Sequence, residues 1–425
     1  MGESHLRVFF IGYVWPEPRS SAAGWRTLAL IESLQELGAE IHFGCAAAES
    51  DNAVDLGELG ITPVNISLNC SSFEAQIQAF DPHIVIFDRF VCEEQFAWRV
   101  AKACPNALRV LDTQDLHCLR DARHRLVKQG RDANGVSYSD LDLNSELALR
   151  ELAAIWRCDL SLIISEYEIE VLTAHFGVSP ALLQYFPLLL GANATADTTE
   201  DHAVSPFTER KHCVVIGNFR HPPNWDALNY LRSEIWPQIR KQLPGVECHI
   251  YGAYPPPKAQ QLHNEKLGFL LKGWAKDSLT VISQARLMLA PLRFGAGQKG
   301  KLLEAMACGT PSITTPIGAE SMFKAEMDWP GAIATDPQLF AEAAINLYQD
   351  ESLWQQAQTQ AARVLNSCFD RQQHSRAFQQ ALSTLQADLN RHRQANFIGQ
   401  MLSHHSLQAQ RYMSQWIEAK NRLPQ

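Results

Sequence analysis

Residues 290–321 read APLRFGAGQKGKLLEAMACGTPSITTPIGAES. The short apolar run that leads into them, Leu287 to Ala290, is typical of a buried parallel strand. The glycine-bearing loop 294–297 follows, a helix is predicted after it, and the small β-prone run 311–314 returns to the sheet. This order of strand, loop, helix and strand predicts an α/β fold with a parallel sheet.

The loop and the start of the helix suit a phosphorylated ligand. Free backbone N–H groups at a helix start, together with the helix dipole, attract phosphate oxygens. Glycines let the backbone approach a ligand closely, although such turns also occur in α/β proteins for structural reasons alone. Lys299 and Lys301, expected in the first helical turn, add the positive charge that a diphosphate needs.

The whole string resembles the donor-sugar motif of the group 1 glycosyltransferases (family 4), in the bacterial form G-x-G-x-x-x-K-x-L-E-A-M-A-x-G-x-P. The positions that match this motif are Gly295, Gly297, Lys301, Leu303, Glu304, Ala305, Met306, Ala307, Gly309 and Pro311, followed by Gly318-Ala319-Glu320. The resemblance implies the GT-B fold, in which two Rossmann-like domains face a cleft and the second domain holds a nucleotide diphosphate sugar.

Length and composition set bounds on the whole chain. With 425 residues, two domains are expected, and 46% hydrophobic and 20% charged residues describe an ordinary globular protein. The net charge of −9 argues against nucleic acid as a partner. Ten scattered cysteines without a CxxC pair, and a start that resembles a strand more than a signal peptide, predict a cytoplasmic protein.

Apolar runs divide the chain into two halves. In the first half, strands are predicted at 7–12, 40–45, 83–88, 107–112, 160–165 and 182–186. In the second half, strands are predicted at 212–217, 246–252 and 268–272, before the stretch 290–321. Late helices are predicted at 337–348, 353–365 and 374–391. The predicted domains are 1–190 (acceptor side), 191–210 (a small, polar linker), 211–370 (donor side) and 371–425 (C-terminal helices, the first crossing back to the first domain).

Two loops of the first half carry candidates that the resemblance implies. Ala23 and Gly24, after the first strand, would lie close to the sugar phosphate, although Gly24 could instead only ease helix packing. Asp115 and His117, after the strand 107–112, would face the reacting sugar. The alternative for Asp115 is that it caps the helix that follows.

A basic run, Arg120, Arg123, Arg125, Lys128 and Arg131, follows the second of these loops. The spacing puts most of its members on one broad face of a helix. A solvated surface is one interpretation, and contact with an anionic membrane or a phosphate-bearing acceptor is the other.

The second half offers more candidates through the resemblance. Its opening strand is followed by a string like the family's G-x-x-x-x-x-P-N-x-D-A-L, in which Arg220 is the residue available for the donor phosphates. Gly273 and Trp274 would lie beside the nucleotide base. The candidate catalytic residues are His117, Asp115, Lys301 and Arg220. The candidate donor-binding residues are Gly24, Gly273, Trp274, Phe294, Gly295, Ala296, Gly297, Lys299, Lys301 and Glu304.

The sequence departs from the family at one position. Many members have Glu-x7-Glu, and the place of the first glutamate is taken here by Ala296. Because that glutamate usually contacts the donor sugar, the contact is lost or moved. Glu304 keeps the second position, which in relatives holds the ribose hydroxyls.

The predicted reaction is transfer of a hexosyl group from a nucleotide diphosphate sugar to a glycan, lipid-linked or other acceptor, with the retention of configuration that family 4 implies. Cations and backbone donors aimed at the leaving diphosphate would lower the barrier. No cofactor and no metal are expected, in keeping with the missing Asp-x-Asp motif. The alternatives are a GT-B epimerase and a non-catalytic nucleotide-sugar-binding subunit.

Overall fold

The computed structural model describes residues 5–190 and 205–421, with residues 405–407 described by their backbone alone. The predicted linker 191–210 therefore lies mostly outside the described residues. Its last residue, Arg210, is fully buried in the second half, where its guanidinium donates to the carbonyl of Cys308 and the hydroxyl of Thr310.

The first half is a parallel sheet of seven strands in the order β3-β2-β1-β4-β5-β6-β7. The apolar runs predicted from the sequence form its central strands, which are buried on both faces, as βαβ connections require. The strands are β1 (Arg7–Gly12), β2 (Glu40–Cys45), β3 (Thr62–Asn65), β4 (Ile84–Asp88), β5 (Leu108–Asp112), β6 (Leu160–Ile163) and β7 (Leu183–Tyr185). The helices between them include α1 (Ala22–Gln35), α2 (Ser72–Phe80), α3 (Arg89–Ala103), α4 (His117–Lys128), α5 (Glu146–Arg157) and α6 (Glu166–Glu170).

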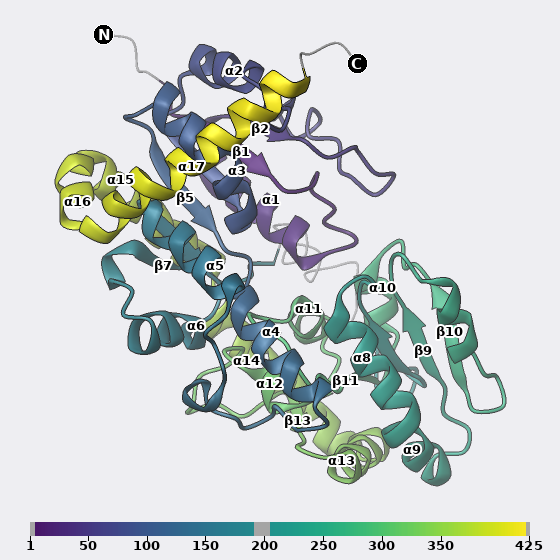
Figure 1. The fold of residues 1–425 in the computed structure, drawn as a ribbon. Helices are drawn as coiled ribbons and strands as arrows, with labels where there is room; N and C mark the ends of the chain where they lie inside the picture. The colour runs from purple at the N-terminus through teal and green to yellow at the C-terminus, as the bar shows by residue number, and fades with distance from the viewer. Residues whose placement is uncertain (1–4, 191–204, 422–425) are drawn as a thin grey trace.

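The second half repeats this plan with six parallel strands in the order β10-β9-β8-β11-β12-β13. The strands are β8 (Cys213–Ile216), β9 (Cys248–Tyr251), β10 (Phe269–Gly273), β11 (Leu287–Ala290), β12 (Ser312–Thr314) and β13 (Gly331–Ile333). The helices are α8 (Pro222–Tyr230), α9 (Trp236–Gln242), α10 (Ser278–Ser283), α11 (Gly300–Ala307), α12 (Pro316–Ala319), α13 (Pro337–Gln349) and α14 (Glu351–Cys368). The predicted α/β fold with two Rossmann-like sheets is confirmed, and the two halves lie against each other (Figure 1).

Each sheet has one point where the strand order reverses. In the first half β1 pairs with both β2 and β4, and in the second β8 pairs with both β9 and β11. Ligands of open α/β sheets bind outside the carboxyl ends of the strands at such switch points. The fold therefore places two binding edges in one molecule.

The C-terminal helices return to the first half. Helix α15 (Arg371–Ala387) packs on α1 and β7, and its Phe378 and Leu382 are buried in the core of the first half. Helix α16 (Leu389–Ala395) follows, and α17 (Phe397–Asn421) lies across α3 and α5 (Figure 1). The predicted helix 374–391 is thus wrong in its length, because helix α15 ends at Ala387 and the backbone of Asp388 is not helical.

Two edge strands were not predicted. Strand β3 contains a proline and is largely exposed, and β13 has three residues, of which one is a glycine. Such short edge strands carry little of the apolar pattern that identifies a buried strand.

Candidate active site

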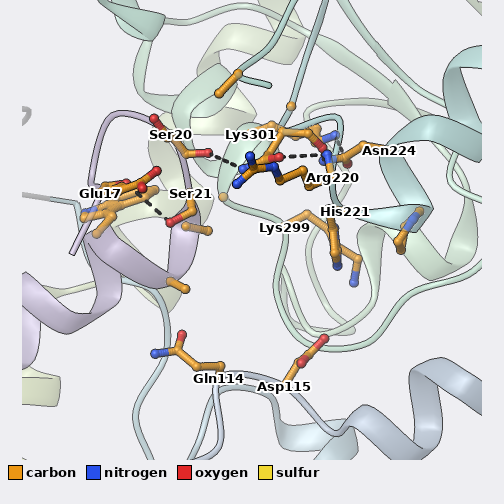
Figure 2. A pocket seen from close by; sticks show the side chains of 18 of the residues that line it. Glu17, Ser20, Ser21, Gln114, Asp115, Arg220, His221, Asn224, Lys299 and Lys301 are labelled. Carbon is orange, nitrogen blue, oxygen red and sulfur yellow. Dashed lines mark hydrogen bonds between the residues drawn. The ribbon is translucent and has the colours of Figure 1, made fainter. Parts of the chain in front are cut away.

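A cavity of about 730 Å³ lies between the two halves, at the switch points of both sheets. The loops that follow β1 and β5 form one wall, and the loops that follow β8 and β11 form the other. Figure 2 shows Glu17, Ser20, Ser21, Gln114 and Asp115 of the first half across from residues of the second half. The two halves therefore build one site together.

Positive charge dominates the lining of this cavity. Three acidic side chains, Glu17, Asp115 and Glu304, lie among its lining residues. The six lysines and arginines that line it are Arg19, Arg89, Arg120, Arg220, Lys299 and Lys301. A concave surface with this excess of cations favours an anionic ligand.

The loop between β11 and α11 brings two lysines to the cavity. The Nζ of Lys301 donates to Oδ1 of Asn224 at 2.6 Å, and the Nζ of Lys299 donates to the carbonyls of Ala296, at 3.3 Å, and Gly297. Lys299 is the capping residue of α11, so its predicted place in the first helical turn is off by one residue. Burial lowers the pKa of each lysine to about 8.

The same loop leaves backbone donors unused. Among the described residues, the N–H groups of Gly295, Ala296 and Gly297 have no protein acceptor. Gly295 and Ala296 line the cavity, as do Gly300 and Lys301 at the start of α11. The loop can therefore offer both N–H groups and ammonium groups to phosphate oxygens.

The lowered pKa values of these two lysines predict that the affinity for an anionic ligand depends on pH. A lysine with a pKa of about 8 is charged below that pH and becomes neutral above it, while a nucleoside diphosphate stays anionic. We expect the affinity for a nucleoside diphosphate to fall by about five- to tenfold per required lysine between pH 8 and pH 9. Calorimetric titration across this range measures it. Lys301→Arg, which stays charged, is the matched variant and should show a smaller fall; constant affinity up to pH 9 would contradict the assignment.

Glu304 lies on α11 and also lines the cavity. Its Oε1 accepts a hydrogen bond from the hydroxyl of Ser278 at 2.5 Å. Burial raises the pKa of Glu304 to about 7. The hydrogen bond holds one carboxylate oxygen in place and leaves the other for a ligand hydroxyl.

The loop between β8 and α8 brings Arg220 to the same wall. The guanidinium of Arg220 lies over the ring of Tyr254, 3.8 Å from its centroid, and its backbone N–H donates to Asn218. His221 and Asn224 also line the cavity and lie beside Lys299 and Lys301 in Figure 2. Neither was among the predicted site residues, although both belong to the string that resembles the family's second-domain opening.

On the opposite wall, Asp115 and His117 lie together as a pair. Their Oδ1 and Nε2 atoms are 3.3 Å apart, and Asp115 also forms an ion pair with Arg120. Burial raises the pKa of Asp115, but the charge of Arg120 and then of His117 more than offsets this and holds it below its ordinary value. Burial lowers the pKa of His117 to about 4, so its imidazole is neutral near pH 7.

The alternative of Asp115 as a helix cap is wrong. Helix α4 begins at His117 with Leu116 in the capping position. The carboxylate of Glu151 accepts the backbone N–H groups of His117 and Cys118, and Glu168 accepts that of Leu116. Carboxylates from α5 and α6 therefore satisfy this helix end, and the side chain of Asp115 remains at the cavity.

The basic run on α4 does not form one exposed face. Arg120 is bound to Asp115, and Arg125 contacts Asp121 and Asp142. Arg123 is 2% exposed and crosses to the second half, where it donates to Glu320 at 2.5 Å and to the carbonyl of Gly295 at 2.8 Å. Both interpretations of the run as a surface, solvated or membrane-facing, are wrong for Arg120 and Arg123 because these residues face the other half of the protein.

Four predicted site residues lie behind the cavity wall instead of lining it. A Cβ on Gly24 would lie 2.5 Å from the backbone of Glu17, so this glycine lets the β1–α1 loop fold back onto α1. Gly297 has a φ of 62°, and a Cβ there would lie 3.0 Å from Asp115. Phe294 is buried and stacks on His124 of α4, with 4.2 Å between the ring centroids. Gly273 has a φ of 85°, and the residue after it, Trp274, does line the cavity.

The second half carries the sequence signature of a known family. Residues 210–350 match the family model "Glycosyl transferases group 1". This segment begins before β8 and ends at the start of α14, and so it contains the entire second sheet. A comparison with curated proteins returned no match.

Solved structures with the same architecture cover most of the chain. One is sucrose-phosphate synthase of Thermosynechococcus elongatus, with 14% identity, a TM-score of 0.66, and 90% of this chain and 100% of that chain covered. HepE of Anabaena, solved with UDP and glucose, has 14% identity and a TM-score of 0.62 over 90% of this chain and 100% of its own. The fold is GT-B. The chain is also similar to the pneumococcal O-GlcNAc transferase GtfA, solved with UDP and GlcNAc. The identity is 10% and the TM-score is 0.63, over 91% of this chain and 100% of that chain.

Within the described residues, no helix is both long and apolar enough to span a bilayer. The same residues contain no group of three or more His, Cys, Asp or Glu side chains that could hold a metal ion.

Proposed function

We propose that this protein transfers a glycosyl group from a nucleotide diphosphate sugar to an acceptor. The observation that carries the proposal is the cation-rich cavity at both switch points, with the β11–α11 loop on its donor wall. The match of residues 210–350 to the group 1 family supports the same assignment. Transfer with retention of configuration, to a glycan or lipid-linked acceptor, remains the expectation from the resemblance to family 4.

The wall that contains the β11–α11 loop and Arg220, here called the donor wall, would act on the leaving group. As the glycosidic bond breaks, negative charge grows on the diphosphate, and preorganised donors near it lower the barrier. Lys301, Lys299 and Arg220 supply three cations, and the N–H groups of Gly295 and Ala296 supply neutral donors. Because these groups can balance the diphosphate charge, we infer that neither a metal ion nor a cofactor is needed.

The opposite wall would act on the sugar. Positive charge grows on the ring carbon that leaves the diphosphate, and an ionised carboxylate nearby stabilises it. Asp115, held ionised by Arg120, is the carboxylate in this position. His117 is neutral, so its imidazole can donate a hydrogen bond to a sugar or acceptor hydroxyl, or accept one from it, without adding charge.

Release of nucleoside diphosphate from a panel of nucleotide sugars tests this function. UDP-sugars come first, because the solved structures of HepE and GtfA hold UDP. Slow release without an acceptor, and faster release with one, is expected. An epimerase would instead change the donor sugar without needing an acceptor, and a binding subunit would bind the donor and release nothing.

Glu304 gives a second test of the same site. At pH 8 we expect Glu304→Gln to weaken binding of UDP by about five- to twentyfold, because a charge-assisted hydrogen bond to the ribose becomes a neutral one. Calorimetry with UDP and 2′-deoxy-UDP measures it. We expect 2′-deoxy-UDP to bind the wild type more weakly than UDP does, and Glu304→Gln to weaken the binding of 2′-deoxy-UDP little further. If the variant lost affinity equally for both ligands, Glu304 would not bind the ribose 2′-hydroxyl.

The expected location is the cytoplasm. All ten cysteines are free thiols, eight of them buried, which suits a reducing compartment. The basic run on α4 does not support contact with an anionic membrane, since Arg120 is paired with Asp115 and Arg123 is bound to the second half.

A further inference from the structure

Helix α17 has an unusual distribution of side chains. Of the 17 large hydrophobic residues that are exposed in the described structure, six lie on this one helix. Phe397, Met401, Tyr412 and Trp416 are 74%, 47%, 64% and 62% exposed. With 3.6 residues per turn, these four positions fall within an arc of about 100° on one side of the helix. Single exposed hydrophobic residues are ordinary, but several large ones on one side of a helix mark a contact surface.

Polar contacts help to hold the inner side of α17 on the protein. Ser414 is buried and accepts a hydrogen bond from Arg99 of α3 at 3.2 Å, and Glu418 contacts Arg99 and the hydroxyl of Ser71. At the other end, Asn396 donates to the carbonyl of Trp156 at 2.7 Å. An ordinary surface helix buries most of its apolar side chains, whereas α17 leaves six large ones exposed and has Leu402 and Ile417 half-buried.

The charge of this region differs from that of the rest of the chain. Residues 389–421 contain four of the 37 lysines and arginines but one of the 46 acidic residues. That acidic residue, Glu418, is 14% exposed and turned toward Arg99. Arg411 and Lys420 are exposed on α17 itself, and Lys420 lies over the ring of Trp416. Arg391 and Arg393 are paired with Asp388 and Asp159, so the positive charge beside the exposed side of α17 comes from Arg411 and Lys420. These two cations are complementary to an anionic surface.

We propose that the exposed face of α17, formed by Phe397, Met401, Tyr412 and Trp416, docks the protein on an anionic lipid surface. Aromatic side chains with a polar edge prefer the boundary between headgroups and hydrocarbon, and basic residues beside them pair with anionic headgroups. Helix α17 crosses α3 and α5 (Figure 1), and its four apolar side chains on this face remain exposed.

A second copy of the chain fits this face less well. A second copy would bring another exposed Arg411 and Lys420 to this interface, with no exposed acidic residue on α17 to balance the added charge. Like charges at an interface weaken association. The charge of the face therefore favours an anionic lipid surface over self-association.

Co-sedimentation of the full chain with vesicles tests the proposal. We expect binding to vesicles that contain phosphatidylglycerol, much weaker binding to phosphatidylcholine alone, and a decrease with added salt. Tyr412→Gln/Trp416→Gln should weaken binding by about tenfold or more, because two aromatic side chains no longer enter the interface. The matched control is Leu339→Gln, which removes an exposed hydrophobic residue from α13 and should bind like the wild type.

Three outcomes would overturn the proposal. One is a wild-type protein that does not sediment with phosphatidylglycerol vesicles. Another is equal binding by the wild type and Tyr412→Gln/Trp416→Gln. The third is a wild-type dimer in size-exclusion chromatography that the same double variant converts to a monomer, since the face would then belong to a second copy.

Discussion

Replacing Lys301 with alanine is expected to slow the release of UDP from a sugar donor by about thirty- to thousandfold. This corresponds to about 2–4 kcal/mol of barrier, the effect of removing one preorganised group that stabilises developing charge. The Nζ of Lys301 lies at the cavity and is held by Asn224, so the cation is in place before the diphosphate arrives. Initial rates at saturating donor measure the effect.

Two variants separate this role from a general loss of charge. Lys301→Arg keeps a cation at the site and should retain more of the turnover than Lys301→Ala. Lys266→Ala removes an exposed lysine that does not line the cavity and should leave the rate unchanged. A folded Lys301→Ala protein with the turnover of the wild type would exclude this lysine from the mechanism.

Replacing Arg123 with methionine is expected to lower the free energy of unfolding by about 3 kcal/mol or more. The guanidinium is 2% exposed, and its loss leaves Glu320 and the carbonyl of Gly295 without their charged partner. Because these partners belong to the second half, the contact between the halves should weaken as well. Denaturant-induced unfolding, followed by fluorescence, measures the change.

The same helix supplies a matched control. Arg125 contacts Asp121 and Asp142, but these side chains are 37% to 70% exposed, so Arg125→Met should cost less than about 1 kcal/mol. Arg123→Met/Glu320→Gln should recover part of the lost stability, since it removes the unpaired buried charge. If Arg123→Met were as stable as Arg125→Met, the ion pair between the halves would contribute little.

The donor wall was the part of the site that the sequence predicted best. Its key features are local, because the strand, the loop with Gly295 and Gly297, and the lysines before and within α11 follow one another along the chain. Central strands of the first half such as β1 and β4 were equally readable, since they are nearly continuous apolar runs. The short edge strands β3 and β13 were missed because they lack such a run.

The contacts between the halves could not be predicted in the same way. Arg123 reaches partners 172 and 197 positions away, and nothing in its neighbours indicates which side of α4 meets the second half. The helix end at Leu116 likewise depends on Glu151 and Glu168 from later helices. Periodicity places residues on a face of a helix, but the identity of the opposing surface is decided by packing.

We propose that the cavity between the halves binds a nucleotide diphosphate sugar through the β11–α11 loop. Calorimetric titration of UDP into the wild type and into Lys301→Ala at pH 7 tests this binding. We predict saturable binding by the wild type and binding weaker by tenfold or more in the folded variant. Equal affinity in the two proteins, or no binding of UDP, ADP or GDP by the folded wild type, would contradict the account.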